Sequence, residues 1–427
     1  MKLALTTRGQ EAGGILVTAM ILGAVLGATL IGYLYWVRTQ HLLVAQSQAW
    51  NQALALAEAG IEEGLAQVNV GFGTNFYTSI YTNWPASAGN LYGPRTNGLG
   101  SGSYAVVIQA SGRCPTIIST GYAVVPIIGK QVRRVVQVTT TNRPAYDTAM
   151  YAQRTITFNG NGIEIDSYDS TDPLHSTNGY YNYATRLAGG DVSTSSGIIN
   201  IGNANINGKL RTGPTGSYNL GANGFVGDLN FYGPGVQAGW YQNDFNMEVK
   251  TITAPNTNTF TTPTGSGTNK YILSGGGYAL NGDLRLSSGE TLLVSGNATL
   301  YVSGNVDMSG SSEVRILPGA ALKIYVAGAS SKFTAVNNFG NASAFEYLGL
   351  PSNTSVTWSG NSDYVGTVYA PNASFSAGGG GSSIYDFQGA CVVDTVKMNG
   401  HFKFHYDEAL KRVGPMSGFI VTSWREL

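Results

Sequence analysis

The chain has 427 residues, with 24 Lys or Arg and 24 Asp or Glu, so its formal net charge is zero. A neutral chain has no general attraction for phosphate backbones, and this argues against nucleic acid as a partner. Charged residues make up 11% of the chain, where about 25% is usual, and there are 58 glycines. This composition is typical of a secreted β-protein with many tight turns and argues against a cytosolic enzyme.

Residues 13–37 form an uncharged stretch that is long enough to cross a membrane. A spanning helix needs roughly 20 residues, and this stretch has 25. A cleaved signal peptide is the alternative, but its apolar region is usually about 7 to 15 residues long and ends at small residues. Here Tyr33, Tyr35 and Trp36 close the stretch, as aromatic residues do at a membrane interface. The sequence therefore predicts a single-pass membrane helix after a leader over residues 1–12.

The residues around and within this helix predict its orientation and a packing face. Lys2, Arg8 and the amino terminus outnumber Arg38 as flanking positive charges, so the N-terminus is expected in the cytoplasm. Small residues recur every four positions within the span, at Ala19, Gly23 and Gly27. Such spacing lets another helix approach closely, although small residues are also common in membrane helices generally.

The helical pattern continues beyond the membrane segment, over residues 38–70. Apolar residues follow spacings of three and four along one stripe: Leu54, Ala57, Ile61, Leu65 and Val68. No proline interrupts residues 13–69, so one continuous helix about 85 Å long is expected at about 1.5 Å per residue. Its outer half is amphipathic and needs a partner surface.

The N-terminal region contains a recognisable series of motifs. A short basic leader ends in Arg8-Gly9, an apolar helix follows, and residues 55–65 read ALAEAGIEEGL. This series resembles the N-terminal region of the PilX-type minor pilin-like proteins of type IV pilus systems. The resemblance implies a protein of the bacterial inner membrane, with its large domain in the periplasm or at the cell surface and pilus or secretion assembly proteins as partners. Typical prepilins carry Glu at the fifth position after the cleaved Gly, whereas Gly14 stands there in this chain.

Residues 71–143 predict an irregular loop followed by a small antiparallel sheet. Residues 71–100 are rich in turn-forming residues and have no helical pattern. Apolar runs then alternate with turns, at 103–109, 116–120, 122–128 and 132–139, which is typical of a meander. A long helix packed on such a sheet resembles the pilin arrangement, and the stripe of Leu54, Ile61 and Leu65 is expected to pack there.

Beyond residue 144 the sequence changes to short apolar triplets broken by Gly, Asn and Ser. Triplets that begin at residues 292, 300, 306, 314 and 322 are six to eight residues apart. Three such strands per turn give coils of roughly 22 residues, which predicts a parallel β-helix. The residues expected to point inward include Leu293, Tyr301 or its neighbours, Val306, Ile316 and Ile324. The predicted fold is therefore mainly β: the membrane helix and its sheet, a β-helix-like domain over 144–410, and a cap or strand over 411–427. A β-sandwich or a propeller is the alternative.

The C-terminal half has motifs of its own: GTVYAPNA at 366–373, FQGACVV at 387–393, FHYDEAL at 404–410 and SWREL at 423–427. Together with IDSYDS at 165–170, this series is similar to an uncharacterised extracellular domain that often follows the PilX-type leader. The resemblance implies an architecture and a compartment, and it implies no known activity.

Asp166, Asp169 and Asp172 lie three positions apart, with Glu164 before them. Such a group of carboxylates could hold calcium or work as an acid–base pair. The spacing fits neither an EF-hand loop nor the Gly-Asp repeat of calcium β-rolls, so the interpretation we favour is that these are structural residues in turns. Calcium is the only cofactor that the sequence suggests.

His401, Lys403 and His405 face one way if this segment is a strand, and Asp407 follows closely. They could form an ionisable cluster, but a solvated edge or a cap over the last coil is the favoured interpretation. Four histidines in the whole chain leave little material for a zinc site or a catalytic triad.

The two cysteines, Cys114 and Cys391, lie 277 positions apart in different predicted domains. An oxidising envelope would permit a disulfide between them. Their separation across a domain boundary favours two free thiols.

These observations predict a structural function without catalytic or cofactor-binding residues. The chain is expected to be a membrane-anchored, pilin-like surface protein that serves as a structural, assembly or adhesion subunit associated with a type IV pilus. One alternative is a β-helix polysaccharide lyase or hydrolase acting on surface glycans, which needs a groove lined by several charged side chains. Another alternative is a pseudopilin-like component of a secretion system.

Overall fold

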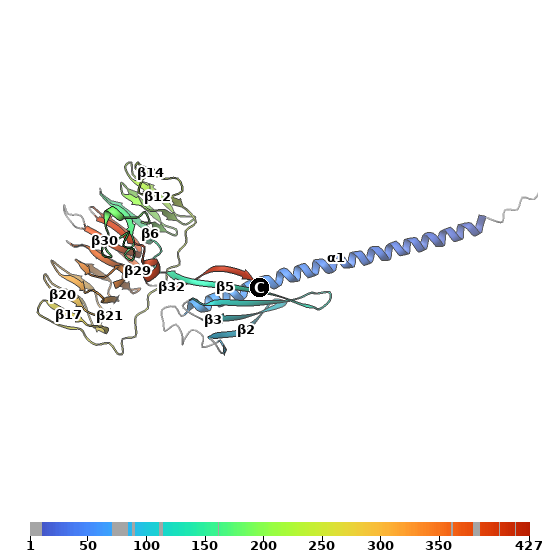
Figure 1. The fold of residues 1–427 in the computed structure, drawn as a ribbon, viewed down its shortest axis with the longest axis horizontal. Helices are drawn as coiled ribbons and strands as arrows, with labels where there is room; N and C mark the ends of the chain where they lie inside the picture. The colour runs from blue at the N-terminus through green and yellow to red at the C-terminus, as the bar shows by residue number, and fades with distance from the viewer. Residues whose placement is uncertain are drawn as a thin grey trace, which may run out of the picture. The chain divides into compact units, whose positions relative to one another are not determined.

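A computed structural model describes most of the chain, in two compact units. The described residues are 11–70, 84–87, 90–110, 114–160, 162–359, 362–378, 385–400, 402–414 and 416–427. The first unit comprises Met1–Arg143 and Gly418–Leu427, and the second comprises Pro144–Ser417 (Figure 1). The predicted leader falls largely outside the described residues, as does His401.

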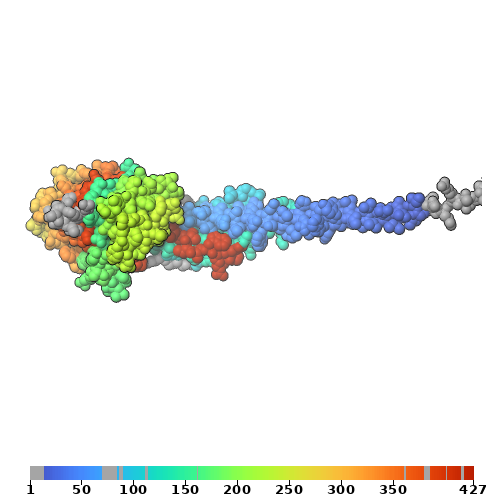
Figure 2. Space-filling model, turned by 90° about the horizontal axis from the view of Figure 1, so that it is seen from above, coloured from blue at the N-terminus to red at the C-terminus, as the bar shows by residue number. Residues whose placement is uncertain are grey.

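Helix α1 runs without interruption from Glu11 to Val70, as the absence of proline predicts. Its 60 residues correspond to about 90 Å at about 1.5 Å per residue. The large apolar side chains from Ile15 to Val44 are exposed, and the first buried side chain is that of Ala45. Figure 2 shows this N-terminal part of α1, in dark blue, standing free of the other described elements. By length and composition, α1 is long and apolar enough to cross a membrane.

The C-terminal half of α1 packs on a six-stranded sheet whose order is β1-β2-β3-β4-β5-β32. Its strands are β1 (Ala86–Ser87), β2 (Leu91–Leu99), β3 (Gly102–Gln109), β4 (Thr116–Val124), β5 (Gln131–Pro144) and β32 (Met416–Glu426). The pairs from β1 to β5 are antiparallel, which confirms the predicted meander. The last strand, β32, comes from the far end of the sequence and joins this sheet beside β5.

Two predictions about this sheet were wrong in detail. The segment 71–100 was expected to be a loop, but β1 and β2 lie within it. Gly93 and Pro94 give β2 the composition of a loop. A register shift between Tyr92 and Arg95 accommodates both residues in the pairing of β2 with β3, as a β-bulge does. Gly121 was read as a break between two runs, but β4 continues through it. Glycine is needed there because an added Cβ would lie 2.0 Å from the carbonyl oxygen of Ala53 on α1.

Small residues of α1 make this close approach possible. The buried side of the helix begins with three alanines at spacings of four: Ala45, Ala49 and Ala53. Further along, Ile61 is buried, and Leu54 and Leu65 pack partly buried against the same core, which confirms the predicted stripe. The core on the sheet side includes Val106, Ile117, Val136 and Val138.

The second unit is a β-helix-like domain with mostly parallel pairing, as predicted. Its first strands are β6 (Met150–Asn159), β7 (Glu164–Tyr168), β8 (Val192–Thr194), β9 (Ile198–Gly202), β10 (Asn205–Asn207), β11 (Leu210–Thr212), β12 (Ser217–Leu220), β13 (Phe225–Gly227), β14 (Gly235–Val236) and β15 (Tyr241–Gln242). The next are β16 (Thr264–Ser266), β17 (Asn269–Leu273), β18 (Gly276–Leu280), β19 (Leu284–Leu286), β20 (Thr291–Val294), β21 (Asn297–Val302), β22 (Val306–Met308) and β23 (Glu313–Ile316). The last are β24 (Ala321–Val326), β25 (Ser330–Phe333), β26 (Val336–Asn338), β27 (Phe345–Gly349), β28 (Ser355–Trp358), β29 (Tyr364–Ala377), β30 (Tyr385–Asn399) and β31 (Phe402–Asp407).

Three strands make one coil, because β20 pairs with β23 and β23 pairs with β26. Leu292 lies beside Val314, and Val314 lies beside Val336, so the chain returns to the same position after each coil. The repeat between these neighbours matches the coil length that the triplet spacing predicted. Stacked coils of this kind share one continuous core.

The coils are not stacked in the order of the sequence. The stack that begins at β17 ends with β30 and β31, and these two strands pair with β6 and β7 from the start of the domain. From there the stack continues through β9, β10, β12 and β13. Residues 243–263 connect β15 to β16 along the outside, where Lys250 exchanges backbone hydrogen bonds with the Tyr369 hydroxyl at 2.9 and 3.1 Å. The first and last coils of the domain are therefore neighbours.

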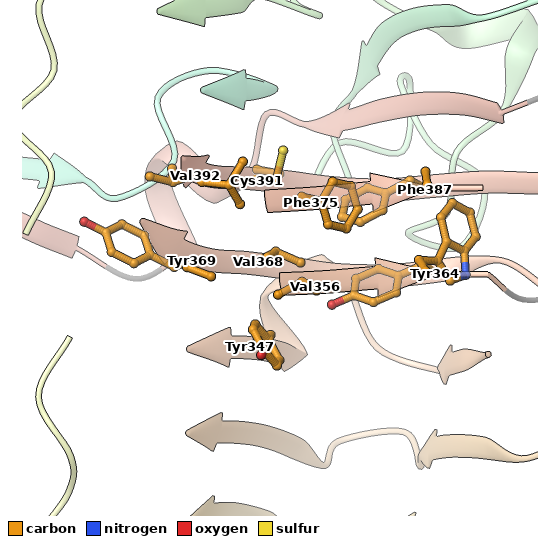
Figure 3. Close-up of a cluster of buried hydrophobic side chains, with 14 of the residues drawn as sticks. Tyr347, Val356, Tyr364, Val368, Tyr369, Phe375, Phe387, Cys391 and Val392 are labelled. Carbon is orange, nitrogen blue, oxygen red and sulfur yellow. The ribbon is translucent and has the colours of Figure 1, made fainter. Parts of the chain in front are cut away.

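Apolar side chains fill the inside of the coils, with a cluster of aromatic rings near the middle of the stack (Figure 3). Phe387 stacks on Tyr364 at 4.6 Å and on Phe404 at 4.4 Å between ring centroids. Val306, Ile316 and Ile324 point inward, as predicted. Leu293 was expected to point inward but faces out, because alternation within β20 buries its neighbours Leu292 and Val294 instead.

Cys114 and Cys391 are both free thiols and belong to different units. Cys391 is fully buried in the β-helix core, and burial raises the pKa of its thiol well above the ordinary value.

Candidate functional site

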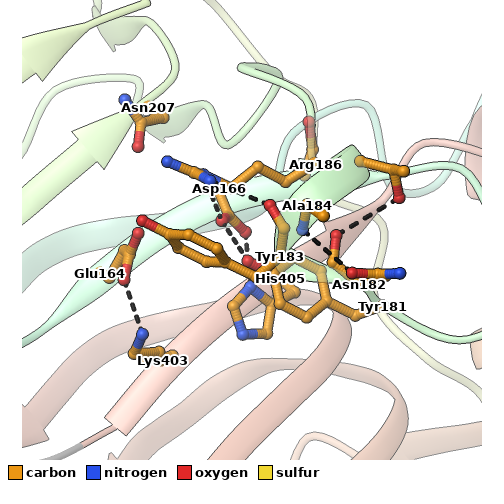
Figure 4. Close-up of polar contacts among 12 residues, drawn as sticks. Glu164, Asp166, Tyr181, Asn182, Tyr183, Ala184, Arg186, Asn207, Lys403 and His405 are labelled. Atoms are coloured by element: carbon orange, nitrogen blue, oxygen red, sulfur yellow. Dashed lines mark hydrogen bonds and ion pairs between the residues drawn. The ribbon is translucent and has the colours of Figure 1, made fainter. Parts of the chain in front are cut away.

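The described residues bring ionisable side chains together on the outer face of β7 and β31. These strands pair in parallel, with Lys403 beside Glu164 and His405 beside Asp166. Because alternate residues of a strand face one way, all four side chains share the outer face, and each cation stands opposite a carboxylate. The Lys403 Nζ lies 2.8 Å from Glu164 Oε2 (Figure 4). The His405 Nδ1 lies 2.5 Å from Asp166 Oδ1.

The segment between β7 and β8 covers this cluster. The ring of Tyr181 stacks on the imidazole of His405, with centroids 3.4 Å apart and planes at 16°. The Tyr181 hydroxyl donates a hydrogen bond to Asp166 Oδ2 at 2.6 Å, and its backbone N–H donates to Gln388 Oε1 at 3.0 Å. Arg186 adds a third cation, with its Nε 3.6 Å from Asp166 Oδ2. The side chains of His405 and Asp166 are consequently 0% exposed.

The local sequence explains the conformation of the segment between β7 and β8 that covers His405 and Asp166. Asn182 begins a single 3-10 turn, η1 (Tyr183–Thr185), and its side chain accepts a hydrogen bond from the N–H of Ala184 at 3.0 Å. Such a side-chain cap is a favoured way to start a turn of helix. Arg186 then folds back so that its guanidinium lies 3.7 Å from the centroid of the Tyr183 ring. This places the guanidinium next to Asp166.

The charge state of the cluster follows from these contacts. Burial alone lowers the pKa of His405, but its interactions with Asp166 and Asp386 outweigh burial, and the net shift of the pKa is upward. Burial and the negative charge of Asp166 raise the pKa of Tyr181, so its hydroxyl remains a donor. The arrangement favours an imidazolium held against a carboxylate, with a protonated phenol on the second carboxylate oxygen.

Two buried atoms of the cluster have no hydrogen-bond partner among the described residues, the Nε of Arg186 and the Nε2 of His405. The His405 Nε2 lies 3.5 Å from Asp386 Oδ1. Asp386 is partly exposed, whereas His405 lies beneath Tyr181. A substrate therefore has no direct route to the His405–Asp166 pair in this conformation. The geometry favours a structural role, in which the pair holds the segment between β7 and β8 against the coils.

The three aspartates proposed as a calcium site have separate partners. Asp166 binds His405 and Tyr181, as described above. Asp169 forms an ion pair with Arg412, and Asp172 accepts a hydrogen bond from the N–H of Leu174 at 2.9 Å. Within the described ranges, no group of three or more His, Cys, Asp or Glu is placed to hold a metal ion. Calcium binding was the alternative to the favoured structural role, and it stays untested.

Sequence reasoning identified only part of this cluster. The shared face of Lys403 and His405 was recognised, but Asp407 was named as the nearby acid. Asp407 instead accepts hydrogen bonds from the backbone N–H groups of Ser170 and Ala409, at 3.0 and 3.1 Å. The true partners come from β7, where Glu164 and Asp166 have the same spacing of two as the cations of β31. The matching spacing of two acids in one strand and two cations in the other was the signal in the sequence that could have predicted this pairing.

The small residues predicted to pack against another helix lie on the free part of α1. Ala19 and Gly23 are exposed and Gly27 is partly exposed. A Cβ added at Gly23 or Gly27 would meet nothing of the described chain within 4 Å. A packing role for this side of α1 stays a prediction.

Comparisons with known proteins concern mainly the β-helix domain. Residues 236–413, less than half of the chain, match a family described as a domain of unknown function, DUF7305. The match begins in β14 and ends in the short helix α2 (Leu410–Val413). The comparison with curated proteins found no match.

Two solved structures show limited similarity to the chain. One is the competence-associated pilin ComZ from Thermus thermophilus, with a TM-score of 0.27 and 11% identity over 88% of this chain and 97% of that one. The other is the DUF3494 domain of an ice-binding protein from Shewanella frigidimarina, with a TM-score of 0.25 and 13% identity over 63% of this chain and 100% of that one. At TM-scores this low, neither alignment supports an inference about fold or function.

Proposed function

We propose that the chain is a membrane-anchored, pilin-like surface protein whose β-helix domain is held outside the cytoplasm. The observation that carries the proposal is the division of α1 into two halves. Residues 15–44 expose large apolar side chains, whereas residues from 45 onward bury small and apolar ones against a sheet. A lipid bilayer or another apolar helix is the environment that an exposed apolar helix of this length requires.

More specifically, we propose that the chain has a structural, assembly or adhesion role of the PilX type in a type IV pilus system. Its support is the leader ending in Arg8-Gly9, the stretch at 55–65, and the packing of α1 on an antiparallel sheet. Excess positive charge before the span supports an N-terminus in the bacterial cytoplasm. The partners proposed on this basis are the inner membrane and pilus or secretion assembly proteins.

The proposed role is structural, without catalysis. A β-helix lyase or hydrolase would place charged side chains in an open groove. On the face of β7 and β31 the charged side chains are instead paired with each other, and Tyr181 covers the His405–Asp166 pair. Surface glycans are retained as candidate ligands of the outer faces, bound without being cleaved.

Affinity capture of the full chain from detergent-solubilised membranes tests the pilus assignment. We expect known pilus-assembly components to co-purify. Replacing Gly23 by Leu should reduce their recovery, because a large side chain prevents close helix approach on the side of Ala19 and Gly27. Gly32→Leu is the matched control, since at about 100° per residue Gly32 lies opposite Gly23 on α1. Capture without pilus components, or equal recovery with both variants, would contradict the assignment.

A further inference from the structure

The hairpin between β4 and β5 exposes apolar side chains at its tip. Residues 125–130 form a closed turn, in which the N–H of Val125 donates to the carbonyl of Lys130 and that of Gly129 donates to the carbonyl of Val125, both at 2.9 Å. At this turn Ile127 is 53% and Ile128 is 46% exposed. Turns at a protein surface are usually built from polar residues, glycine and proline. Two adjacent exposed isoleucines on a fixed turn therefore point to an apolar contact.

The hairpin tip lies against the part of α1 nearest to the predicted membrane segment. Ala123 and Val125 pack with Ala45 and Ala49 of the helix. Beside this contact is a groove of about 440 Å³, and its wall continues the apolar surface from the tip onto α1. Its lining includes Leu43 and Trp50 of α1 and Val125, Ile128 and Lys130 of the hairpin.

Helix geometry places this level next to a bilayer. The uncharged span ends at Val37, and Leu43 follows six residues later, about 9 Å further along the axis at about 1.5 Å per residue. The headgroup layer on each side of the hydrocarbon core is roughly 5 to 8 Å thick. The level of Leu43 is therefore just outside the headgroup layer when α1 spans the membrane, within the length of a side chain that projects from the tip toward the bilayer. An ordinary helix tilt of about 20° toward the hairpin brings them deeper.

We propose that the β4–β5 hairpin tip is a second membrane contact, with Ile127 and Ile128 inserted into the headgroup layer of the bilayer that α1 crosses. The inference rests on the proposed membrane anchor. Its occupant is lipid because the exposed apolar surface is continuous with the span. Arg38 directly follows the span, and Lys130 lines the groove beside Ile128, so both positive charges suit an anionic lipid surface. The contact would fix the rotation of α1 and hold the six-stranded sheet close to the membrane.

Spin-label accessibility in the reconstituted full chain tests this proposal. Ile128→Cys carries the label, in vesicles of phosphatidylethanolamine and phosphatidylglycerol, with Cys114→Ser removing the more accessible native thiol. Cys391 is fully buried and does not compete for the label. Leu99→Cys is the matched control, because Leu99 is an apolar residue of similar exposure at a hairpin turn. Ser101, two residues after Leu99, accepts a hydrogen bond from Gln52 of α1. Gln52 lies nine residues beyond Leu43, so this hairpin turn is about 13 Å further from the membrane than the β4–β5 tip.

The proposal predicts that the label at position 128 collides severalfold more with oxygen than with an aqueous nickel chelate, relative to the label at position 99. Equal aqueous accessibility at both positions would overturn it. Protection of position 128 from both reagents would also overturn it, because this shows burial against protein, such as a second copy of the chain. A label at Leu26→Cys reports on the anchor separately: if it is aqueous, the anchor itself is wrong and the hairpin contact fails with it.

Discussion

Among single residues, His405 gives the clearest pH-dependent prediction. The folded protein raises the pKa of His405 above its ordinary value of about 6.5. A raised pKa means that the folded state binds the proton more tightly than the unfolded state does. The resulting stabilisation is complete below about pH 6.5 and is lost as the pH rises through the folded-state pKa. We therefore expect the unfolding free energy of the β-helix domain to fall with rising pH in this window, and His405→Gln to remove that dependence.

Asp166→Asn is the control for this mechanism. It removes the charge that sustains the imidazolium, so the pKa of His405, measured by NMR titration of its ring, should fall relative to the wild type. An unchanged titration of His405 in this variant would show that the pair in Figure 4 does not set its charge.

Tyr181→Phe tests the cover over the pair. The variant keeps the ring on His405 but loses the hydroxyl that donates to Asp166 at 2.6 Å. A hydrogen bond to a charged group contributes about 1.5 to 3 kcal/mol, so the domain should lose about that much unfolding free energy by denaturant titration. Tyr183→Phe is the matched control: Tyr183 is an exposed neighbour, and its change should stay within about 0.5 kcal/mol. Similar losses for both variants would contradict the role given to Tyr181.

At the scale of elements, the seam between α1 and β4 depends on the absence of a side chain at Gly121. A Cβ there would lie 2.0 Å from a backbone oxygen of α1, so Gly121→Ala must push the helix away from the sheet. Overpacking of this kind costs about 1 to 3 kcal/mol. Hydrogen exchange of the β4 amides should accelerate accordingly. Gly98→Ala in β2 is the control, because its nearest neighbour would be 4.0 Å away, and it should leave the exchange rates unchanged.

The sequence predicted some elements well because their signals are local. The length of α1 follows from an unbroken helical pattern, and the stripe through Ile61 follows from its periodicity. The same reasoning missed β2, whose glycine and proline resemble a loop, and misread Gly121, whose neighbour on α1 is distant in sequence. It could not place β32 in the first sheet either, because the partner of an edge strand is decided by tertiary contacts.

At the scale of the whole molecule, the coil architecture predicts a strong asymmetry between inward and outward positions. Val306→Asp places a carboxylate without a partner inside the coils, which should cost several kcal/mol. Asp307→Asn changes the next residue of β22, which faces out, and should cost no more than about 0.5 kcal/mol. Denaturant unfolding of both variants measures the difference. Equal tolerance at the two positions would contradict the parallel coils.

Sequence spacing could predict the coil but not the order of coils. Triplets at regular intervals indicate the length of a coil because each coil repeats the same three short strands. The pairing of β30 with β6 produces no periodic pattern in the sequence, because it joins strands from opposite ends of the domain. The cluster of His405 and Asp166 depends on this stacking, so its partners could not be assigned without the fold.

Membrane fractionation shows whether α1 anchors the whole molecule in a membrane. Full-length protein should stay in the membrane pellet after alkaline extraction and float with lipid. The chain lacking residues 1–37 loses the span and should appear in the soluble fraction with its β-helix core intact, as judged by cooperative unfolding. If the folded, truncated chain still pellets and floats with membranes as the full chain does, the claim of a single anchor through α1 is contradicted.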